Sequence, residues 1–304
     1  MSSNPSVNKR QKERNRQEHQ AEKADKKKQR RVEKAARPPG EPGVDPDIAG
    51  IIPGPQPRED DEALLVDVGS AMSRPWTVLP HEPLRRLEPN LWEVEGSLPS
   101  MPIKRRMCIV RRTDGSLLVH SALAADDATM REIDAWGRVK TIVVPNAFHR
   151  LDAAAFRARY PEANVVCPKP VTRRVAEEVA VDGALDAIAA GDDLRVEPLD
   201  GVKMGEAVFV VTSPGDRVTL LFNDALFNHA HASGFKGFVF RMIGSTGGPR
   251  VTPLFRFAAV DDAAKLRAHL SRLADTPGLR RLIPAHGEII EESPQATLKS
   301  VAGL

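Results

Sequence analysis

Three apolar, β-branched stretches of this chain each stop at polar side chains that can do chemistry. The first leads to His149 and Asp152, the second to Asp224, and the third to His286. A buried strand has this appearance where it delivers a side chain to the edge of a sheet. Imidazole and carboxylate groups are donors for divalent metal ions, provided that the three stretches bring their ends together at one rim.

The elements that must position these residues can be predicted from residue 87 onward. Apolar alternation and turn residues predict strands at 91–94, 107–110, 116–120, 139–144, 164–167, 194–198, 207–211, 218–222 and 282–283. Helices are expected at 126–136 and 152–160, and an amphipathic helix precedes the last strand. Helices, then many strands, then a helix and a strand suit a layered α/β sandwich better than a doubly wound sheet.

The chain is uneven in charge, which divides it into an arm, a linker and a body. Residues 1–37 contain thirteen Lys or Arg against five Asp or Glu and carry about +8, so the remainder carries about −5 of the total of +3. We expect 1–37 to be a basic arm that is disordered or a solitary helix. Residues 38–86 are expected to form a Pro/Gly-rich linker and lead-in, and 87–304 the folded domain.

The basic arm has three possible roles. Its dense cationic run at 26–31 would give nucleic acid or another polyanion a salt-sensitive, sequence-independent contact. A solvating tail is the first alternative. An anionic membrane surface is the second, although the arm has no apolar face for insertion. The arm also has no aromatic residues for base stacking.

Composition argues against several classes of protein. The chain has no run of eighteen apolar residues and no apolar stretch behind its basic start, so neither a transmembrane helix nor a secretory signal is expected. The only cysteines, Cys108 and Cys167, are too few for a disulfide scaffold or a thiolate zinc site. We expect two buried thiols in a cytoplasmic protein. Motifs for a serine nucleophile elbow or a Gly-rich phosphate loop are missing.

The order and spacing of the polar-ended stretches resemble the metallo-β-lactamase superfamily over about residues 88–300. The similar pieces are Val119-His120-Ser121, Val144-Pro145-Asn146 with His149, Asn223-Asp224, and Pro284-Ala285-His286-Gly287. The resemblance implies a four-layer αββα sandwich with metal ligands on loops at one end of two packed sheets. Members of the superfamily usually hold two metal ions, most often zinc, and activate a water between them.

Carried over residue by residue, the resemblance implies metal-ligand roles for His149, Asp152, Asp216, Asp224 and His286. The superfamily's His-x-His-x-Asp-His loop corresponds to residues 145–152. In this segment only His149 and Asp152 could bind a metal ion. Asp216 stands where the superfamily has a histidine, whereas Asp224 and His286 match its bridging aspartate and last histidine. This set could hold one divalent ion and hardly two, with zinc as the first choice and iron or manganese as alternatives.

Three other histidines could line such a site. His229 and His231 alternate, so on a strand their side chains would face the same side, although the Ala-Ser-Gly that follows is typical of a loop. His120 ends an expected strand beside Ser121, where the superfamily often has an acidic residue. Each of these histidines also has a purely structural explanation.

Two functions remain open on these residues. In the first, the chain is a metal-dependent hydrolase of an unknown small-molecule substrate, with a metal-bound water as the nucleophile. In the second, it is a catalytically inactive pseudoenzyme that has lost the metal and serves as a binding or scaffold protein. The basic arm would contact a polyanion in that case.

Overall fold

The computed structural model describes residues 75–99, 101–229 and 247–303, which lie within the compact unit Asp67–Leu304. The basic arm, most of the linker and His231 fall outside the described residues, so the expectations for them stay predictions. None of the described helices is long and apolar enough to cross a membrane.

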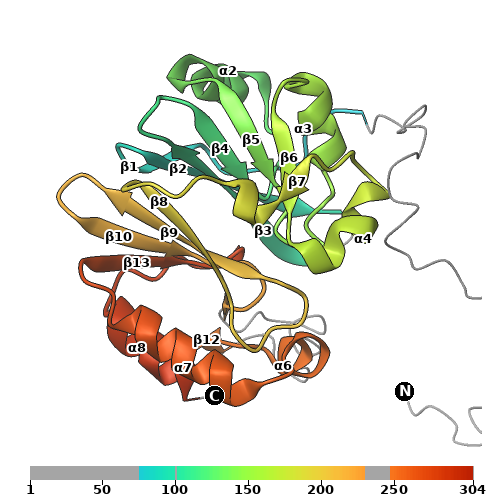
Figure 1. Ribbon diagram of the computed structural model, residues 1–304. Helices are drawn as coiled ribbons and strands as arrows, with labels where there is room; N and C mark the ends of the chain where they lie inside the picture. The colour runs from blue at the N-terminus through green and yellow to red at the C-terminus, as the bar shows by residue number, and fades with distance from the viewer. Residues whose placement is uncertain (1–74, 100, 230–246, 304) are drawn as a thin grey trace, which may run out of the picture. The chain divides into compact units, whose positions relative to one another are not determined.

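The first sheet has seven strands in the order β1-β2-β3-β4-β5-β6-β7 (Figure 1). They are β1 (Arg85–Glu88), β2 (Leu91–Leu98), β3 (Met101–Arg111), β4 (Leu117–His120), β5 (Val139–Val143), β6 (Asn164–Cys167) and β7 (Gly183–Ala184). Strands β1 to β4 pair antiparallel, whereas β4 to β7 pair in parallel. The strands predicted at 107–110 and 116–120 are confirmed, as parts of an antiparallel β3–β4 hairpin.

Two further sheets carry the rest of the strands. The second sheet has the order β13-β10-β9-β8, and a short third sheet has the order β12-β11-β14. Their strands are β8 (Leu194–Pro198), β9 (Ala207–Ser213), β10 (Arg217–Leu221), β11 (Phe227–His229), β12 (Gly248–Arg250), β13 (Leu279–Ile283) and β14 (His286–Gly287). Strands β10 and β13 run parallel, so their carboxyl ends share one edge of the second sheet.

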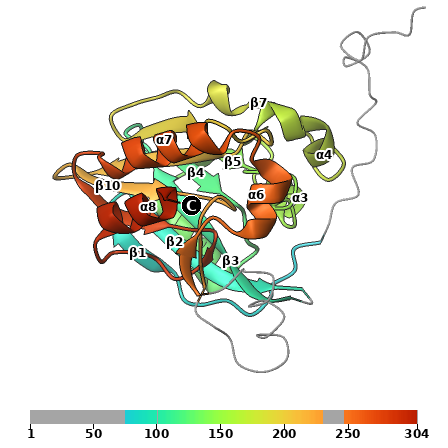
Figure 2. The ribbon, with the colours of Figure 1, turned by 90° about the horizontal axis from the view of Figure 1, so that it is seen from below.

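Helices cover the outer faces of the two large sheets. Figure 1 shows α2 (Asp127–Trp136) and α3 (Ala153–Arg159) on the first sheet, and Figure 2 shows α7 (Ala263–Ala274) and α8 (Pro294–Ala302) across the second. The shorter helical segments are η1 (Lys169–Val171), α4 (Thr172–Ala176), η2 (Leu185–Ala187) and α6 (Pro253–Ala259). Helix α2 starts at the N-cap Asp126, whose carboxylate accepts a bond from the Thr129 backbone N–H at 2.8 Å.

Three cores fill the spaces between these four layers. Ile109 of β3 packs with Phe156 of α3 in the first, and its neighbour Val110 packs with Phe209 of β9 between the sheets. Leu270 of α7 belongs to the third core, beneath the second sheet. Because consecutive side chains of a strand face opposite ways, each large sheet contributes to two cores. The chain therefore has the four-layer αββα sandwich that the resemblance to the metallo-β-lactamase superfamily predicts.

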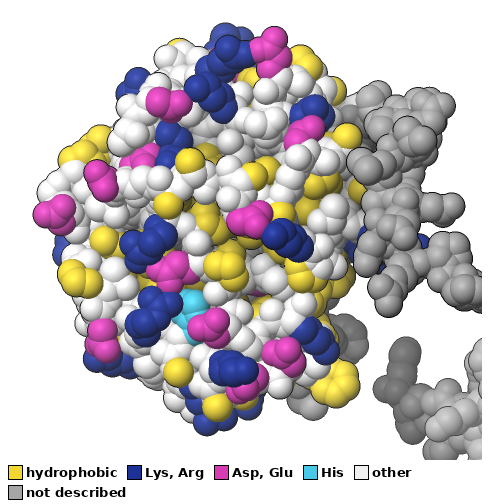
Figure 3. Space-filling model, viewed as in Figure 1, with side chains coloured by type: hydrophobic (Ala, Val, Ile, Leu, Met, Phe, Trp, Pro, Cys, Tyr) yellow, Lys and Arg dark blue, Asp and Glu magenta, His cyan; other side chains and the backbone are white. Residues whose placement is uncertain are grey.

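The outer surface carries charges of both signs. On the face shown in Figure 3, Lys and Arg side chains are interspersed with Asp and Glu. Many of them form exposed ion pairs, such as Arg86 with Glu132 and Lys169 with Asp186. Exposed pairs of this kind contribute little to stability, so the three apolar cores carry most of it.

Both cysteines are buried, as the sequence predicts, and they should be chemically inert in the folded protein. Burial, together with the nearby Glu93 carboxylate, raises the pKa of the Cys108 thiol to about 12, and burial also raises the pKa of Cys167. Since the thiolate is the reactive form, neither thiol should react with Ellman's reagent at pH 8. Both should react in guanidinium, and stoichiometric labelling of the native protein would contradict the buried placement.

Candidate metal centre

Three of the five ligand candidates converge on one point. His149 Nε2 lies 3.2 Å from Asp224 Oδ1 and 3.2 Å from His286 Nε2, and the remaining pair, His286 Nε2 and Asp224 Oδ1, is 3.4 Å apart. No other group of three or more His, Cys, Asp or Glu with this geometry occurs in the described part of the chain. The side chains of both histidines are about 95% buried, and Asp224 is only slightly more accessible.

The sheet topology explains the convergence. Asp224 follows β10 and His286 follows β13, and these strands are parallel neighbours, so both residues leave the same edge of the second sheet. His149 follows β5, whose parallel neighbour β4 ends at His120 in the first sheet. The rims of the two facing sheets meet at the cluster, where the strands end and backbone is free to form loops.

His286 is fixed by its surroundings in one tautomer. Its Nδ1 lies 2.6 Å from the carbonyl oxygen of Lys104, which can only accept, so Nδ1 carries a hydrogen and Nε2 of the neutral ring presents a lone pair to the cluster. The Phe227 ring packs against the imidazole with centroids 5.0 Å apart. The next residue, Gly287, has φ +89°, and a Cβ there would lie 2.1 Å from the Asn228 carbonyl oxygen. Only glycine fits this approach.

His149 is held by the ends of two neighbouring strands. Its Nδ1 lies 3.0 Å from the Ser121 hydroxyl, which directly follows β4. Its backbone N–H donates to Asn146 Oδ1 at 3.1 Å, and the Phe148 N–H donates to the same oxygen at 2.8 Å. The Asn146 side chain therefore shapes the loop that carries the imidazole.

Asp224 is held from two sides. The Asn146 Nδ2 donates to its outer oxygen Oδ2 at 2.6 Å, which leaves Oδ1 for the cluster. Burial would raise the pKa of Asp224, but His149 and His286 outweigh it and hold this pKa well below its ordinary value. Behind it, the buried Glu206 accepts a bond from the Ala225 N–H at 2.7 Å. Burial and the charge of Asp224 raise the pKa of Glu206 well above its usual range.

Two adjacent arginines of β3 fasten the loops around the cluster. Arg105 pairs with Asp152 and donates to the Ala122 carbonyl at 3.2 Å. Arg106 donates to the Pro284 and Gly287 carbonyls at 2.7 and 2.9 Å, on both sides of His286. The same guanidinium pairs with Glu93 and Glu95, each at 2.8 Å. Both cations are thus nearly fully buried beside carbonyl and carboxylate partners. Arg105 Nε alone of their nitrogens has no hydrogen-bond partner among the described residues.

The donor set and its spacing fit one divalent metal ion. Two ligand atoms bonded to one tetrahedral zinc ion at about 2.0–2.1 Å lie about 3.3–3.4 Å apart. The three separations of 3.2–3.4 Å match this spacing. Each donor residue also has a partner on its other polar atom, namely Ser121, Lys104 or Asn146. Such partners orient metal ligands and set the tautomer of histidines.

The two other ligand candidates lie elsewhere. Asp152 directs its carboxylate to Arg105 and to the Ala124 N–H at 2.8 Å, so its charge is already neutralised. Asp216 is exposed in the β9–β10 turn with φ +55°, at the start of β10, whereas Asp224 follows the end of that strand. Neither carboxylate therefore belongs to the cluster of His149, Asp224 and His286.

The expected lining histidines have different surroundings. His120 is buried at the end of β4 with its ring edge against Phe209, and its Nε2 has no hydrogen-bond partner among the described residues. Burial, with a smaller effect of His149, lowers the pKa of His120 to about 3. His229 is half-buried on β11, the strand that pairs with β14, and burial and His286 lower its pKa as well. His231 lies outside the described residues.

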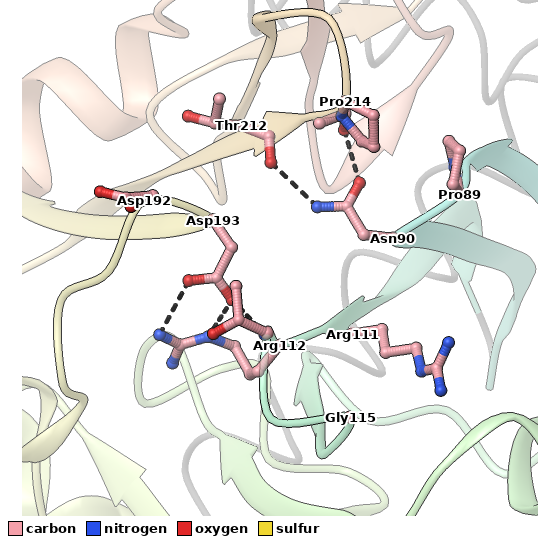
Figure 4. A pocket seen from close by; sticks show the side chains of 11 residues that line it. Pro89, Asn90, Arg111, Arg112, Gly115, Asp192, Asp193, Thr212 and Pro214 are labelled. Carbon is pink, nitrogen blue, oxygen red and sulfur yellow. Dashed lines mark hydrogen bonds and ion pairs between the residues drawn. The ribbon is translucent and has the colours of Figure 1, made fainter.

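A cavity lies at the opposite ends of the strands. It has a volume of about 440 Å³ and is lined by the β3–β4 and β9–β10 turns (Figure 4). Its polar side chains pair with one another: Arg112 binds Asp193 at 2.6 Å, and Asn90 donates to the Thr212 carbonyl at 2.9 Å. Since β4 and β10 start at this cavity and end near the cluster, the two places are separated by the length of a strand.

Comparisons with known proteins found similar solved structures only. No family model and no curated protein matches the sequence. Solved structures similar to the chain include a metallo-β-lactamase from Pontibacter korlensis, at 15% identity over 73% of this chain and 98% of that one, with a TM-score of 0.49. Another, from Hirschia baltica, is 13% identical with the same coverage and TM-score. Similarity at this level of sequence identity gives no information about the metal centre.

The supporting residues of the site were not singled out from the sequence. Lys104, Arg105 and Arg106 stand directly before the buried Met107–Val110 part of β3, and two arginines in such a strand are a signal of buried ion pairs. Asn146 belongs to a quoted piece, but its two-sided hydrogen bonding has no sequence signature. Glu206 precedes β9 without any distinguishing pattern.

Replacing Arg106 should destabilise the protein strongly. Arg106→Met leaves the buried Glu93 and the two carbonyls of the His286 loop without this donor, so we expect the free energy of unfolding to fall by about 3–5 kcal/mol. Urea unfolding measures the change. Arg138→Met, which removes an exposed ion pair with Glu162, is the control and should cost less than about 1 kcal/mol. Equal losses in the two variants would contradict the role of Arg106.

His120 should make the metal-free protein acid-sensitive. Its pKa is about 3 in the folded state and about 6.5 when unfolded. The unfolded chain therefore binds the additional proton between these values, and stability falls by about 1.4 kcal/mol for each pH unit of acidification. In His120→Leu this loss should be absent, because nothing titrates at that position. Urea unfolding at pH 7, 6, 5 and 4 with chelator present tests this, and parallel profiles for both proteins would refute it.

Proposed function

We propose that this chain is a metal-dependent hydrolase that holds one divalent metal ion through His149, Asp224 and His286. The supporting observation is the convergence of two imidazole nitrogens and one carboxylate oxygen to within 3.2–3.4 Å of one another. Two imidazoles and a carboxylate suit zinc first, with iron and manganese as alternatives. One ion is proposed because Asp152 and Asp216, which a second ion would need, are outside the cluster.

Three protein donors favour a catalytic over a structural site. Closed structural zinc sites have four protein ligands, whereas catalytic sites have three and keep a position open. When bound, a divalent ion supplies Lewis acidity and lowers the pKa of a water toward about 7. The side chains and backbone around the cluster supply the orientation of the ligands. Lys104 and Ser121 orient the two imidazoles, and Asn146 directs Asp224 Oδ1 inward.

The alternative is a pseudoenzyme that keeps the sandwich as a binding or scaffold protein. It would need no metal, because His149 Nε2–H donating to Asp224 already forms an ion-free hydrogen-bonded cluster. Contact of the basic arm with nucleic acid or another polyanion is a separate proposal, which rests on the charge of residues 1–37 alone.

Metal content distinguishes the two. The full-length protein, stripped with a chelator and dialysed against zinc, should contain close to one zinc per chain by elemental mass spectrometry. His286→Ala and Asp224→Asn each remove one of three donors, so zinc affinity should fall at least about tenfold. Zinc-dependent hydrolysis of 4-nitrophenyl acetate, lost in Asp224→Asn, would support the catalytic part.

His81→Ala is the matched control, because His81 bonds to Glu82 and Asp126 and lies outside the cluster. This variant should bind zinc as the wild type does. A wild-type protein with an intact circular dichroism spectrum that retains neither zinc, iron nor manganese would overturn the hydrolase proposal and favour the scaffold alternative.

A further inference from the structure

Ser121 combines a contact to the cluster with a strained backbone. Its hydroxyl oxygen lies 3.0 Å from His149 Nδ1, and its φ is +58°. Two other described non-glycine residues have positive φ, Asp216 and Ser293, and both are exposed, whereas Ser121 is only 2% exposed. A left-handed conformation at a buried serine is costly and persists only where the surroundings determine it.

The surroundings of Ser121 do determine its backbone. The Ser121 N–H donates to the Val143 carbonyl of β5 at 3.0 Å, which continues the pairing of β4 with β5. Immediately afterwards, the Ala122 carbonyl accepts from Arg105 at 3.2 Å, and the Ala124 N–H donates to Asp152 at 2.8 Å. These bonds turn the chain sharply after β4 and leave the hydroxyl directed at the imidazole.

The two histidines of the cluster have chemically different partners. Lys104 presents a carbonyl to His286, which can only accept a hydrogen bond. Ser121 presents a hydroxyl to His149, which can donate or accept. On its other side, His149 Nε2 faces the Asp224 carboxylate and the lone pair of His286 Nε2, each at 3.2 Å. Two acceptors at this position favour a hydrogen on His149 Nε2 whenever no metal is bound.

We propose that Ser121 is a positioning residue that lets His149 exchange tautomers when the metal centre fills. Without metal, His149 Nε2–H donates to Asp224 and Nδ1 accepts from the Ser121 hydroxyl. With metal, Nε2 uses its lone pair for the ion, Nδ1 carries the hydrogen, and the Ser121 hydroxyl turns to accept it. One proton leaves Nε2 for solvent and one arrives at Nδ1, so the charge of the ring is unchanged.

This inference rests on the proposed metal site, and its first test uses the wild-type protein. Imidazole ¹⁵N chemical shifts of the full-length protein should report the Nε2–H form of His149 in chelator and the Nδ1–H form after one equivalent of zinc. His286 should report the Nδ1–H form in both states, which makes it the internal control. An unchanged tautomer of His149 in a protein that binds zinc would overturn the role of Ser121. Failure to bind zinc would instead overturn the proposed function.

Two variants separate the hydroxyl from the backbone strain. Ser121→Ala and Ser121→Gly both lose the hydroxyl, and we expect zinc affinity, measured by competition with a chromophoric chelator, to fall about 10–100-fold in each. Ser121→Gly also relieves the positive φ, so it should unfold at a higher urea concentration than Ser121→Ala. Unchanged affinity in both variants, or a loss confined to Ser121→Ala, would overturn the proposal. Ser293→Gly relieves strain away from the cluster and should leave zinc affinity unchanged.

Discussion

One strand holds both halves of the candidate site, because neighbouring side chains of a strand point to opposite faces. In β3, Arg105 faces the loop after β4 and Asp152, and Arg106 faces the loop that carries His286. The carbonyl of Lys104 adds the bond to the His286 ring. Three consecutive residues thereby set the distance between a loop of the first sheet and a loop that follows the second. The placement of the donor atoms depends on these contacts of Lys104, Arg105 and Arg106.

The sequence predicted the fold better than the site, for physical reasons. Strand alternation and turn residues are local, so β3, β4 and the cap of α2 were predictable from neighbouring residues. His149, Asp224 and His286 were predictable as a group because each follows a buried strand. The ion pair of Asp152 was not predictable, because nothing near Asp152 in the sequence reveals that Arg105, 47 residues away, would neutralise its charge. The position of Asp216 just before β10 was not predictable either, because a short sequence pattern does not reveal which end of a strand a residue occupies.

Two carboxyl groups at the cluster stand in different electrostatic environments. Burial acts on both groups, but the imidazoles of His149 and His286 hold the pKa of Asp224 well below its ordinary value, whereas burial and the charge of Asp224 raise the pKa of Glu206. A second carboxylate charge at that depth would repel Asp224 in a region of low dielectric. The Glu206 carboxyl instead accepts backbone N–H groups of the turn that carries Asp224. The cluster thus combines one carboxylate with two imidazole groups.

The wide separation of the three donors along the chain affects the order of folding events. His149 lies 75 residues from Asp224 and 137 from His286, so closing these loops costs entropy that no local contact repays. The first sheet alone carries one donor, and the other two follow strands of the second. A metal ion that needs all three donors could therefore bind only after the two sheets have docked, and the rate of docking would limit the rate of binding.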